Sequence, residues 1–200
     1  MLLEGKQIGF ALPEGHFSMP AILDEVRKLV AAGANIYPLF LATSDHPELE
    51  PHYHQTKQML EQITGHEMMP TTLAEDVGEL FSEQLAFDIL VVAPCPGNFL
   101  AKLVNSRTTS ISLAKSVKHL QVGKPVVLAL ITNGDSENLL QNVQQILSLK
   151  SFFLVPFGPT DEDGKQIYLS RLDLLYETVL QALQQKQLTP VYIEPCWLPS

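Results

Sequence analysis

Short apolar runs alternate along the chain with longer segments in which apolar residues recur every three or four positions. The short runs have the length of buried strands, and the longer segments have the period of amphipathic helices. This alternation predicts a three-layer α/β fold in which helices cover both faces of a doubly wound parallel sheet. The expected strands are residues 6–12, 34–42, 64–70, 89–93, 124–130 and 151–156. Helices are expected within residues 18–33, 55–63, 74–85, 98–105, 110–120, 139–147 and 170–185.

Residues 88–105, DILVVAPCPGNFLAKLVN, form the stretch around which the other elements are arranged. The apolar run at 89–93 is typical of a central strand buried on both faces, and the two prolines after it are expected to end that strand. Gly97 permits a sharp turn, and Asn98 is a suitable N-cap for the next helix. A strand, a tight loop and a helix N-terminus together direct backbone N–H groups to one place. This arrangement predicts an anion site.

Three further expectations concern the arrangement of single residues. Pro38 lies inside the second strand and indicates an edge or an irregular strand. Residues 157–169 are polar and are predicted to form a loop after the last core strand, and Ser170 and Asp173 have the spacing of a capping box for the final helix. The helix before that loop is expected to bury its leucine, valine and isoleucine side chains, which are Leu139, Leu140, Val143, Ile146 and Leu147.

The composition indicates one domain covering residues 1–200, with an extended tail from about residue 190. The formal net charge of −9 argues against nucleic-acid binding, which needs clustered Lys and Arg. The sequence shows no signal-peptide pattern and no apolar run of the length that crosses a bilayer, so no membrane association is expected. Its two cysteines, Cys95 and Cys196, are far apart, which favours a reducing, cytoplasmic location.

Candidate chemistry lies in three loops that follow strands, at residues 13–18, 94–98 and 131–136. In a doubly wound sheet such loops meet at the carboxyl edge, where ligands bind. The first loop contains only Gly15, so it lacks a dinucleotide fingerprint, but it also carries His16, a candidate for anion binding or proton transfer. Cys95 is interpreted as structural rather than as a thiolate nucleophile. The histidines at 46, 52 and 54 lack a third ligand at a recognisable spacing, so no metal site is predicted.

Several longer motifs resemble a known family. The runs GKQIGFAL, VVAPCPGNFLAKLVN and KPVVLALITN, followed by VPFG and RLDLL, are similar in sequence and order to the B subunits of dipicolinate synthase. That family has the flavoprotein fold that it shares with the flavin-dependent cysteine decarboxylases. The pattern A-P-x-x-G-N-x-x-x-K-L-x-N, from Ala93 to Asn105, is the most specific part of the resemblance, and Thr132, Asn133 and Asn142 also match.

This resemblance implies a Rossmann-like or flavodoxin-like sheet with a site for flavin mononucleotide (FMN) at the three loops. His16 is the candidate catalytic residue. The residues that would bind the cofactor are Gly15, His16, Ser18, Pro94, Gly97, Asn98, Lys102, Thr132 and Asn133.

The resemblance also implies partners and a reaction. A dehydrogenase-like A subunit, which would bring NADP, is expected to work with this chain in oxidising a dihydrodipicolinate-type intermediate to dipicolinate during sporulation. The family fold further implies a homo-oligomer built from trimers. Two alternatives stay open: a free-standing FMN-dependent decarboxylase of the cysteine decarboxylase type, and a non-catalytic scaffold paralogue. The decarboxylases' substrate-clamp cysteine motif is absent, which counts against the first of these.

The chain departs from the family pattern at positions that would contact a phosphate. Where the family has Thr-Gly-Ser before the histidine, this chain has Pro13, Glu14 and Gly15, and two usually small hydroxylated residues are Pro96 and Phe99. Lost hydrogen bonds to a charged group cost about 1.5–3 kcal/mol each. The sequence therefore predicts a flavin site that is present but weak, so that the protein is isolated without stoichiometric flavin.

Overall fold

The computed structural model describes residues 2–13, 19–42, 53–72, 87–105, 123–132, 136–162 and 165–193. The strands are β1 (Gln7–Pro13), β2 (Asn35–Ala42), β3 (Met69–Thr72), β4 (Ile89–Pro96), β5 (Val126–Thr132), β6 (Phe152–Leu154), β7 (Phe157–Glu162) and β8 (Lys165–Ser170). The helices are α1 (Met19–Ala31), α2 (Tyr53–Thr64), α3 (Gly97–Asn105), α5 (Ser136–Leu147), the short 3₁₀ helix η3 (Leu172–Leu174) and α6 (Leu175–Leu183).

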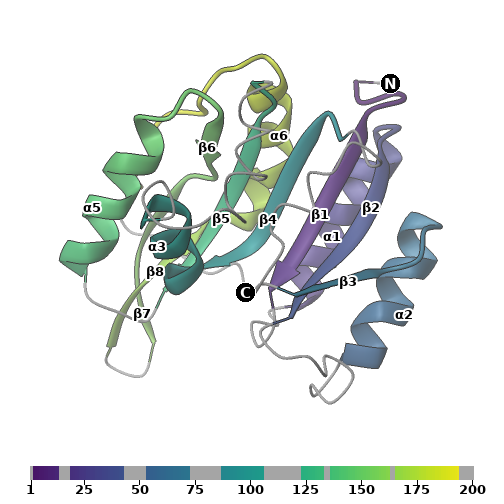
Figure 1. Cartoon of the computed structure of the whole chain (residues 1–200), viewed down its shortest axis with the longest axis horizontal. Helices are drawn as coiled ribbons and strands as arrows, with labels where there is room; N and C mark the ends of the chain where they lie inside the picture. The colour runs from purple at the N-terminus through teal and green to yellow at the C-terminus, as the bar shows by residue number, and fades with distance from the viewer. Residues whose placement is uncertain are drawn as a thin grey trace.

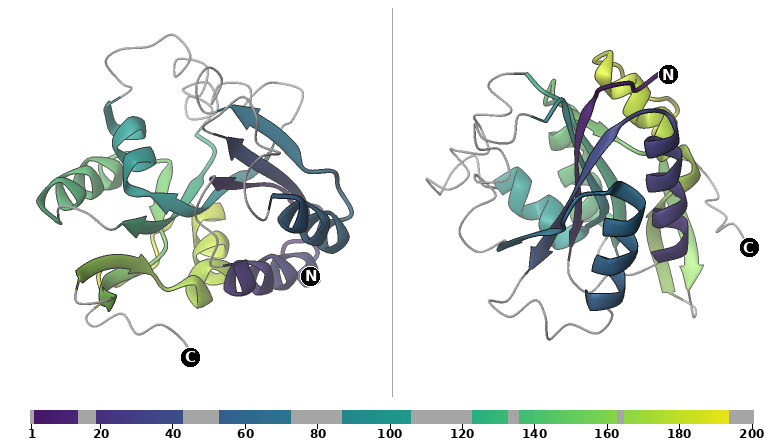
Figure 2. Two further views of the ribbon diagram at one scale, coloured as in Figure 1. Left: turned by 90° about the horizontal axis from the view of Figure 1, so that it is seen from below. Right: turned by 90° about the vertical axis from the view of Figure 1, so that its right-hand side faces the viewer.

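One sheet of eight strands separates two layers of helices (Figure 1). Its order is β3-β2-β1-β4-β5-β8-β7, and β6 also pairs with β5. Seen from below, α1, α2 and α6 lie on one side of the sheet, and α3 and α5 lie on the other (Figure 2, left). The predicted three-layer α/β fold is therefore confirmed, with a sheet that is mixed rather than wholly parallel.

The strand at the centre of the sheet is β4, as the apolar run at 89–93 predicts. It pairs in parallel with β1 on one side and with β5 on the other, and all its residues are buried. Alternate side chains enter the two cores, so Ile89 and Val91 pack toward α1 and α6 while Leu90 and Val92 pack toward α3 and α5. Burial on both faces explains the absence of polar residues from this run.

The prediction that two prolines end this strand is wrong, because β4 continues to Pro96. β1 pairs with β4 only as far as Val92, and the register with β5 shifts between Val92 and Cys95. Pro94 therefore lies where the regular hydrogen-bond ladder is already interrupted, and its missing N–H leaves no ladder bond unmade. Similarly, Pro38 lies in β2 just before the pairing with β3 begins at Leu39. The expectation of an edge or irregular strand at Pro38 is wrong, because β2 lies between β1 and β3 and its register with β1 is unbroken through Pro38.

The prediction that the polar segment 157–169 forms a loop is wrong. This segment forms most of the hairpin β7–β8. Its strands pair antiparallel from Phe157 with Ser170 to Glu162 with Lys165, and β8 also pairs antiparallel with the end of β5. The sequence signal was the dipeptide Asp163-Gly164, which is typical of two-residue hairpin turns, followed by Ile167, Tyr168 and Leu169. Strands close to the edge of a sheet need few apolar residues. The polar composition of this segment therefore gave no sign that it forms strands.

Ser170 does not cap the last helix, which corrects the predicted capping box. Its hydroxyl is buried, accepts a hydrogen bond from the Leu130 amide at 2.7 Å and donates one to the Val155 carbonyl at 3.1 Å. Asp173 instead accepts two hydrogen bonds from the Arg171 guanidinium, and this contact holds the pKa of the Asp173 carboxyl below its usual value. Ser170 lies between β5 and the end of β6, and this position makes its hydroxyl a link between the two strands instead of a helix cap.

Helix boundaries mostly follow the sequence. Gly33 ends α1 with a φ of 96°, and its N–H bonds the Val30 carbonyl, as a glycine C-cap predicts. The prediction of Asn98 as an N-cap is wrong, because α3 already begins at Gly97 and Asn98 lies in its first turn, two positions after the N-cap position. On α5, Leu139, Val143 and Ile146 are buried as predicted, but Leu140 and Leu147 are about two-fifths exposed.

Some expectations lie outside the described residues, namely the helices at 74–85 and 110–120 and the tail after residue 193. The described part of the tail does not run free, since the Phe157 amide bonds the Val191 carbonyl and the Ile193 amide bonds the Phe157 carbonyl. Within the described ranges, no helix has both the length and the apolar character needed to span a membrane.

Candidate functional site at the carboxyl edge of the sheet

The candidate site lies where the central strands end. β4 leads directly into α3 at Gly97, and β5 ends beside it at Thr132. The two strands run in parallel, with Pro96 opposite Ile131 in the register, so their carboxyl ends are neighbours. The expectation that the 94–98 and 131–136 segments share one edge is met by the described residues of both segments. In a sheet of this kind, that edge is where ligands bind.

Gly97 is required here by close approach. A Cβ atom at this position would lie 2.8 Å from Thr132 Oγ1 and 3.2 Å from Thr132 Cβ. Any larger residue would push the first turn of α3 away from the end of β5. The glycine therefore brings the helix N-terminus and the Thr132 hydroxyl, which is half-buried, into contact.

The N-terminus of α3 suits a negatively charged group. Its first N–H groups have no partner within the helix, and the helix dipole gives this end a partial positive charge. The first turn of α3 contains no acidic residue, and the Asn98 side chain is exposed there. Phe99 and Leu100 are buried and fix the helix against the core beneath it. Neutral donors therefore surround the helix N-terminus on a rigid support.

Residues next to this turn contribute packing instead of hydrogen bonds. Pro96 has no N–H and is buried, and the Phe99 ring is only 5% exposed. Cys95 is fully buried, and desolvation raises the pKa of its thiol far above the usual value. A thiol that is neutral and inaccessible is not a nucleophile, so the structural interpretation of Cys95 is confirmed.

The hairpin adds a wall that the sequence interpretation missed. Thr132 is paired with Tyr168 of β8, and Tyr168 is buried with its ring edge-on to Phe157 at 6.5 Å between centroids. The last residue of β5 thus lies between α3 and β8. The aromatic residue in the run Ile167-Tyr168-Leu169 was the available signal, and it was overlooked because the segment was interpreted as a loop.

The structure places only some of the nine predicted cofactor residues. Gly97 and Thr132 are in contact, Asn98 is in the adjacent turn, and Pro94 is buried in β4 away from the loop surface. Lys102 lies in the second turn of α3. The other four, Gly15, His16, Ser18 and Asn133, lie outside the described residues, so the candidate catalytic His16 stays a prediction. Among the residues that the structure describes, no group of His, Cys, Asp and Glu could hold a metal ion.

No protein-family model matches the chain. The B subunit of dipicolinate synthase from Bacillus subtilis (strain 168) is 32% identical over 196 residues, which cover 96% of each protein. This chain belongs to the family of dipicolinate synthase B subunits. The resemblance of the motifs around Gly97 and Thr132 to that family is therefore confirmed over nearly the whole chain.

Solved structures agree with this assignment. The crystal structure of the dipicolinate synthase B subunit from Bacillus halodurans superposes with a TM-score of 0.77 at 28% identity, covering 97% of this chain and 99% of that one. The FMN-dependent cysteine decarboxylase SpaF superposes with a TM-score of 0.58 at 19% identity, covering 91% of this chain and 99% of SpaF. The family to which this chain belongs therefore shares its fold with a flavin-dependent decarboxylase.

Proposed function

We propose that this chain is the B component of a two-subunit dipicolinate synthase. It would act with a dehydrogenase-like A subunit in oxidising a dihydrodipicolinate-type intermediate to dipicolinate during sporulation, in the cytoplasm. The observation that carries the proposal is the match to the Bacillus subtilis B subunit across 96% of both chains. That relative is named as one subunit of an enzyme, which supports a partner chain. The first loop has no dinucleotide fingerprint, so NADP would bind to the partner and not here.

The described part of the edge fits the phosphate end of FMN. The α3 N-terminus offers N–H groups that have no partner within the helix, Asn98 and Thr132 offer neutral polar groups, and no carboxylate lies in the first turn. When bound, a flavin would supply electron or hydride transfer. Pro96 and Phe99 supply no side-chain donor, because both are buried and apolar. The proposed flavin site therefore relies mainly on backbone donors, and its affinity is expected to be low.

Reconstitution tests the proposed role. This chain and its dehydrogenase-like partner are purified and supplied with aspartate semialdehyde, pyruvate, the aldolase that joins them, and NADP, and dipicolinate is measured. We expect formation with both chains and little with either alone. Full activity of the partner alone would remove any catalytic role for this chain and favour a scaffold. Turnover of thiol-containing acids by this chain alone would instead support the decarboxylase alternative.

The flavin part is tested separately by titrating FMN into the purified protein and following flavin fluorescence. Asn98→Asp places a carboxylate in the first turn of α3. There it interacts favourably with the helix dipole but repels a phosphate. We expect FMN affinity to fall about tenfold or more, while the midpoint of thermal unfolding is unchanged or higher. Gln58→Glu makes the same change of charge on the exposed face of α2 and is the matched control.

Two further observations would sharpen or reject the weak-flavin proposal. Replacing Glu14 with Gly and Gly15 with Ser restores the family pattern in the first loop and should raise FMN affinity. A protein that is purified fully yellow, with one flavin per chain, would contradict the predicted weak binding. An Asn98→Asp variant that binds FMN as tightly as the unchanged chain would contradict the assignment of the phosphate to α3.

A further inference from the structure

A row of side chains crosses one face of the sheet from its outer edge to the candidate site. Tyr192 bridges in parallel to Phe157 at the start of β7, and Thr132 at the end of β5 pairs with Tyr168 of β8. The Tyr192 and Phe157 rings lie edge-on with centroids 5.7 Å apart, and Phe157 is likewise edge-on to Tyr168 at 6.5 Å. The row ends at Gly97, where a Cβ would lie 2.8 Å from Thr132 Oγ1. A continuous series of neighbours thus connects the C-terminal segment with the first turn of α3.

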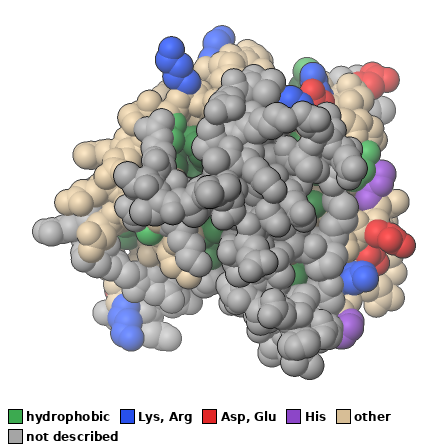
Figure 3. All heavy atoms as spheres, viewed as in Figure 1, with side chains coloured by type: hydrophobic (Ala, Val, Ile, Leu, Met, Phe, Trp, Pro, Cys, Tyr) green, Lys and Arg blue, Asp and Glu red, His purple; other side chains and the backbone are tan. Residues whose placement is uncertain are grey.

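Among the described residues, the hairpin β7–β8 joins the strand β5 only at the base of the hairpin. β8 pairs with β5 at Ile131–Leu169 and Thr132–Tyr168, and the hairpin then continues beyond the ends of β4 and β5 (Figure 1). The described residues near its free end are exposed, namely Asp161, Lys165 and Gln166. The space-filling view shows a basic side chain at that end (Figure 3). The position of Thr132 therefore depends on what holds the base of the hairpin.

The segment 187–193, the C-terminal strap, holds that base from the outer side. The Gln187 side chain accepts a hydrogen bond at 2.9 Å from the amide of the last residue of β6, and it donates one at 2.7 Å to the carbonyl of the same residue. Farther along the strap, the Phe157 amide donates to the Val191 carbonyl at 2.9 Å, and the Ile193 amide donates to the Phe157 carbonyl at 2.8 Å. The strap is thus fixed to β6 and to β7, as an added edge strand would be.

We propose that Tyr192 is a positioning residue, which holds Thr132 against the N-terminus of α3 through the two rings between them. The inference rests on the proposed function, because Thr132 and α3 form the proposed phosphate site. Edge-on aromatic pairs favour one relative orientation of their rings, so the strap fixes the angle at which the hairpin leaves the sheet. Close-packed contacts transmit displacement, and Gly97 leaves no free space beside Thr132. A shift of the hairpin therefore moves the donors of α3.

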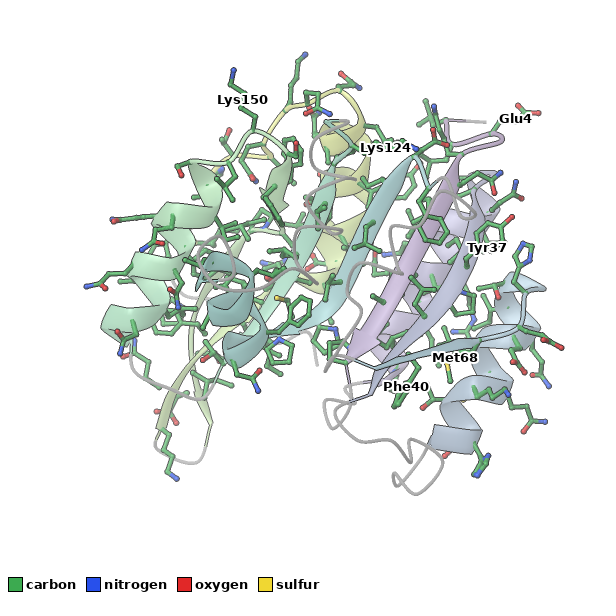
Figure 4. The ribbon with its side chains drawn as sticks, viewed as in Figure 1. Glu4, Tyr37, Phe40, Met68, Lys124 and Lys150 are labelled. Carbon is green, nitrogen blue, oxygen red and sulfur yellow. The ribbon has the colours of Figure 1, made fainter. Side chains whose placement is uncertain are left out.

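The exposure of Tyr192 makes its positioning role separable from folding. Its side chain is 41% exposed, so its truncation removes the ring contact with Phe157 without opening a cavity in the core. Leu147 is 39% exposed and provides the matched control. It ends α5, three residues before Lys150, which lies at the edge of the molecule opposite the hairpin (Figure 4). A change found in Tyr192→Ala but not in Leu147→Ala is therefore specific to the row.

The first test follows Thr132 directly and needs no flavin. In protein labelled at its threonine methyl groups, the Thr132 signal is identified by NMR from its loss in Thr132→Ser. Tyr192→Ala should shift this signal, because the Tyr168 ring beside Thr132 moves, whereas Leu147→Ala should leave it in place. Tyr192→Phe retains the edge-on ring and should retain the original signal. An unmoved signal in Tyr192→Ala would overturn the inference, as would an equal shift in Leu147→Ala or in Tyr192→Phe.

The second test measures FMN affinity by flavin fluorescence. Tyr192→Ala should raise the FMN dissociation constant about three- to tenfold, the range that loss of one edge-on aromatic pair allows. Tyr192→Phe and Leu147→Ala should stay within about twofold of the unmodified chain. In a Tyr168→Leu background, Tyr192→Ala should have little further effect, because the connection is already broken. Additive losses of binding free energy from the two substitutions would contradict transmission through Tyr168 and overturn the inference.

Together the two tests separate this inference from the proposed function. If the unmodified chain shows no FMN binding, the flavin site is rejected, and the Thr132 signal alone decides whether Tyr192 positions Thr132. If FMN binds with the same affinity to Tyr192→Ala as to the unmodified chain, the inference is overturned while the proposed site stands. A shifted Thr132 signal together with weaker FMN binding supports both.

Discussion

The helices α1 and α5 both bury an apolar stripe against the sheet, but the residues on their outward faces differ. α1 packs Ile22, Val26 and Leu29 against the sheet, and α5 packs Leu139, Val143 and Ile146 against its other face. Outward, α1 exposes Asp24, Arg27 and Lys28, which take part in ion pairs along the helix. The exposed residues of α5 from Asn138 to Ser148 are amides, leucines and a serine.

The difference separates two kinds of information in a helical sequence. The inward period of three and four residues places each helix on the sheet, and it is equivalent in α1 and α5. The outward residues do not follow from this period: those of α1 are charged, whereas those of α5 from Asn138 to Ser148 are neutral. An inward stripe therefore predicts the fold, whereas the outward residues differ from helix to helix without changing it.

The largest effect is expected from the buried stripe of α5. Ile146→Ala should destabilise the protein by about 2–5 kcal/mol, because the side chain is fully buried and its removal leaves a cavity. Leu147→Ala, at the adjacent residue, should cost less, about 1 kcal/mol, because about two-fifths of that side chain is already exposed. Urea unfolding of the two variants and of the unmodified chain measures both costs. Equal costs for the two substitutions would contradict the assignment of inner and outer faces.

A smaller effect is expected where the same layer contacts the site. Gly97→Ala brings a Cβ to 2.8 Å from Thr132 Oγ1, so the first turn of α3 or the end of β5 must move. We expect a loss of about 1–3 kcal/mol of stability. Thr132→Ala removes the hydroxyl that clashes, so the double variant should be more stable than the sum of the single variants predicts. Strict additivity in this thermal or urea double-mutant cycle would show that the two residues do not touch.

The smallest effect is expected on the charged face of α1. Glu25 is 3% exposed, the Lys28 ammonium bonds its carboxylate, and this contact raises the pKa of Lys28 above its ordinary value of 10.5. A raised lysine pKa stabilises the folded state at pH below 10.5, and the contribution is lost as pH rises through the folded-state pKa. Because the Lys28 side chain is 53% exposed, Lys28→Met should cost less than about 1 kcal/mol at neutral pH.

Unfolding free energies of the unmodified chain and of Lys28→Met, compared at neutral pH and at about pH 12, check this prediction. The difference between the two proteins should shrink at the higher pH, where Lys28 loses its proton. A difference that stays constant would mean that the methylene groups of Lys28, and not its charge, stabilise α1.

Much of the candidate site follows from the sequence around residues 88–105. The apolar run, the glycine and the helix that follows could be located from their pattern, and the neighbouring position of Gly97 and Thr132 follows from the rule that parallel strands end at one edge. The pattern did not show that Thr132 fills the space beside Gly97, nor that Tyr168 pairs with Thr132. Both depend on contacts between segments that are distant in sequence.

The sequence by itself determined the three layers, the central strand and the main buried stripe of each described helix, because burial imposes a period of two or of three to four on residues that are neighbours in the chain. Only the tertiary structure decided the role of Ser170, which bonds β5 and the end of β6, and the tolerance of Pro94 at a break in the ladder. Hydrogen bonds to a buried hydroxyl and gaps in a ladder are made by strands far apart in sequence. A local sequence pattern therefore does not indicate which distant strand will bond to a buried polar group or leave a gap in the ladder.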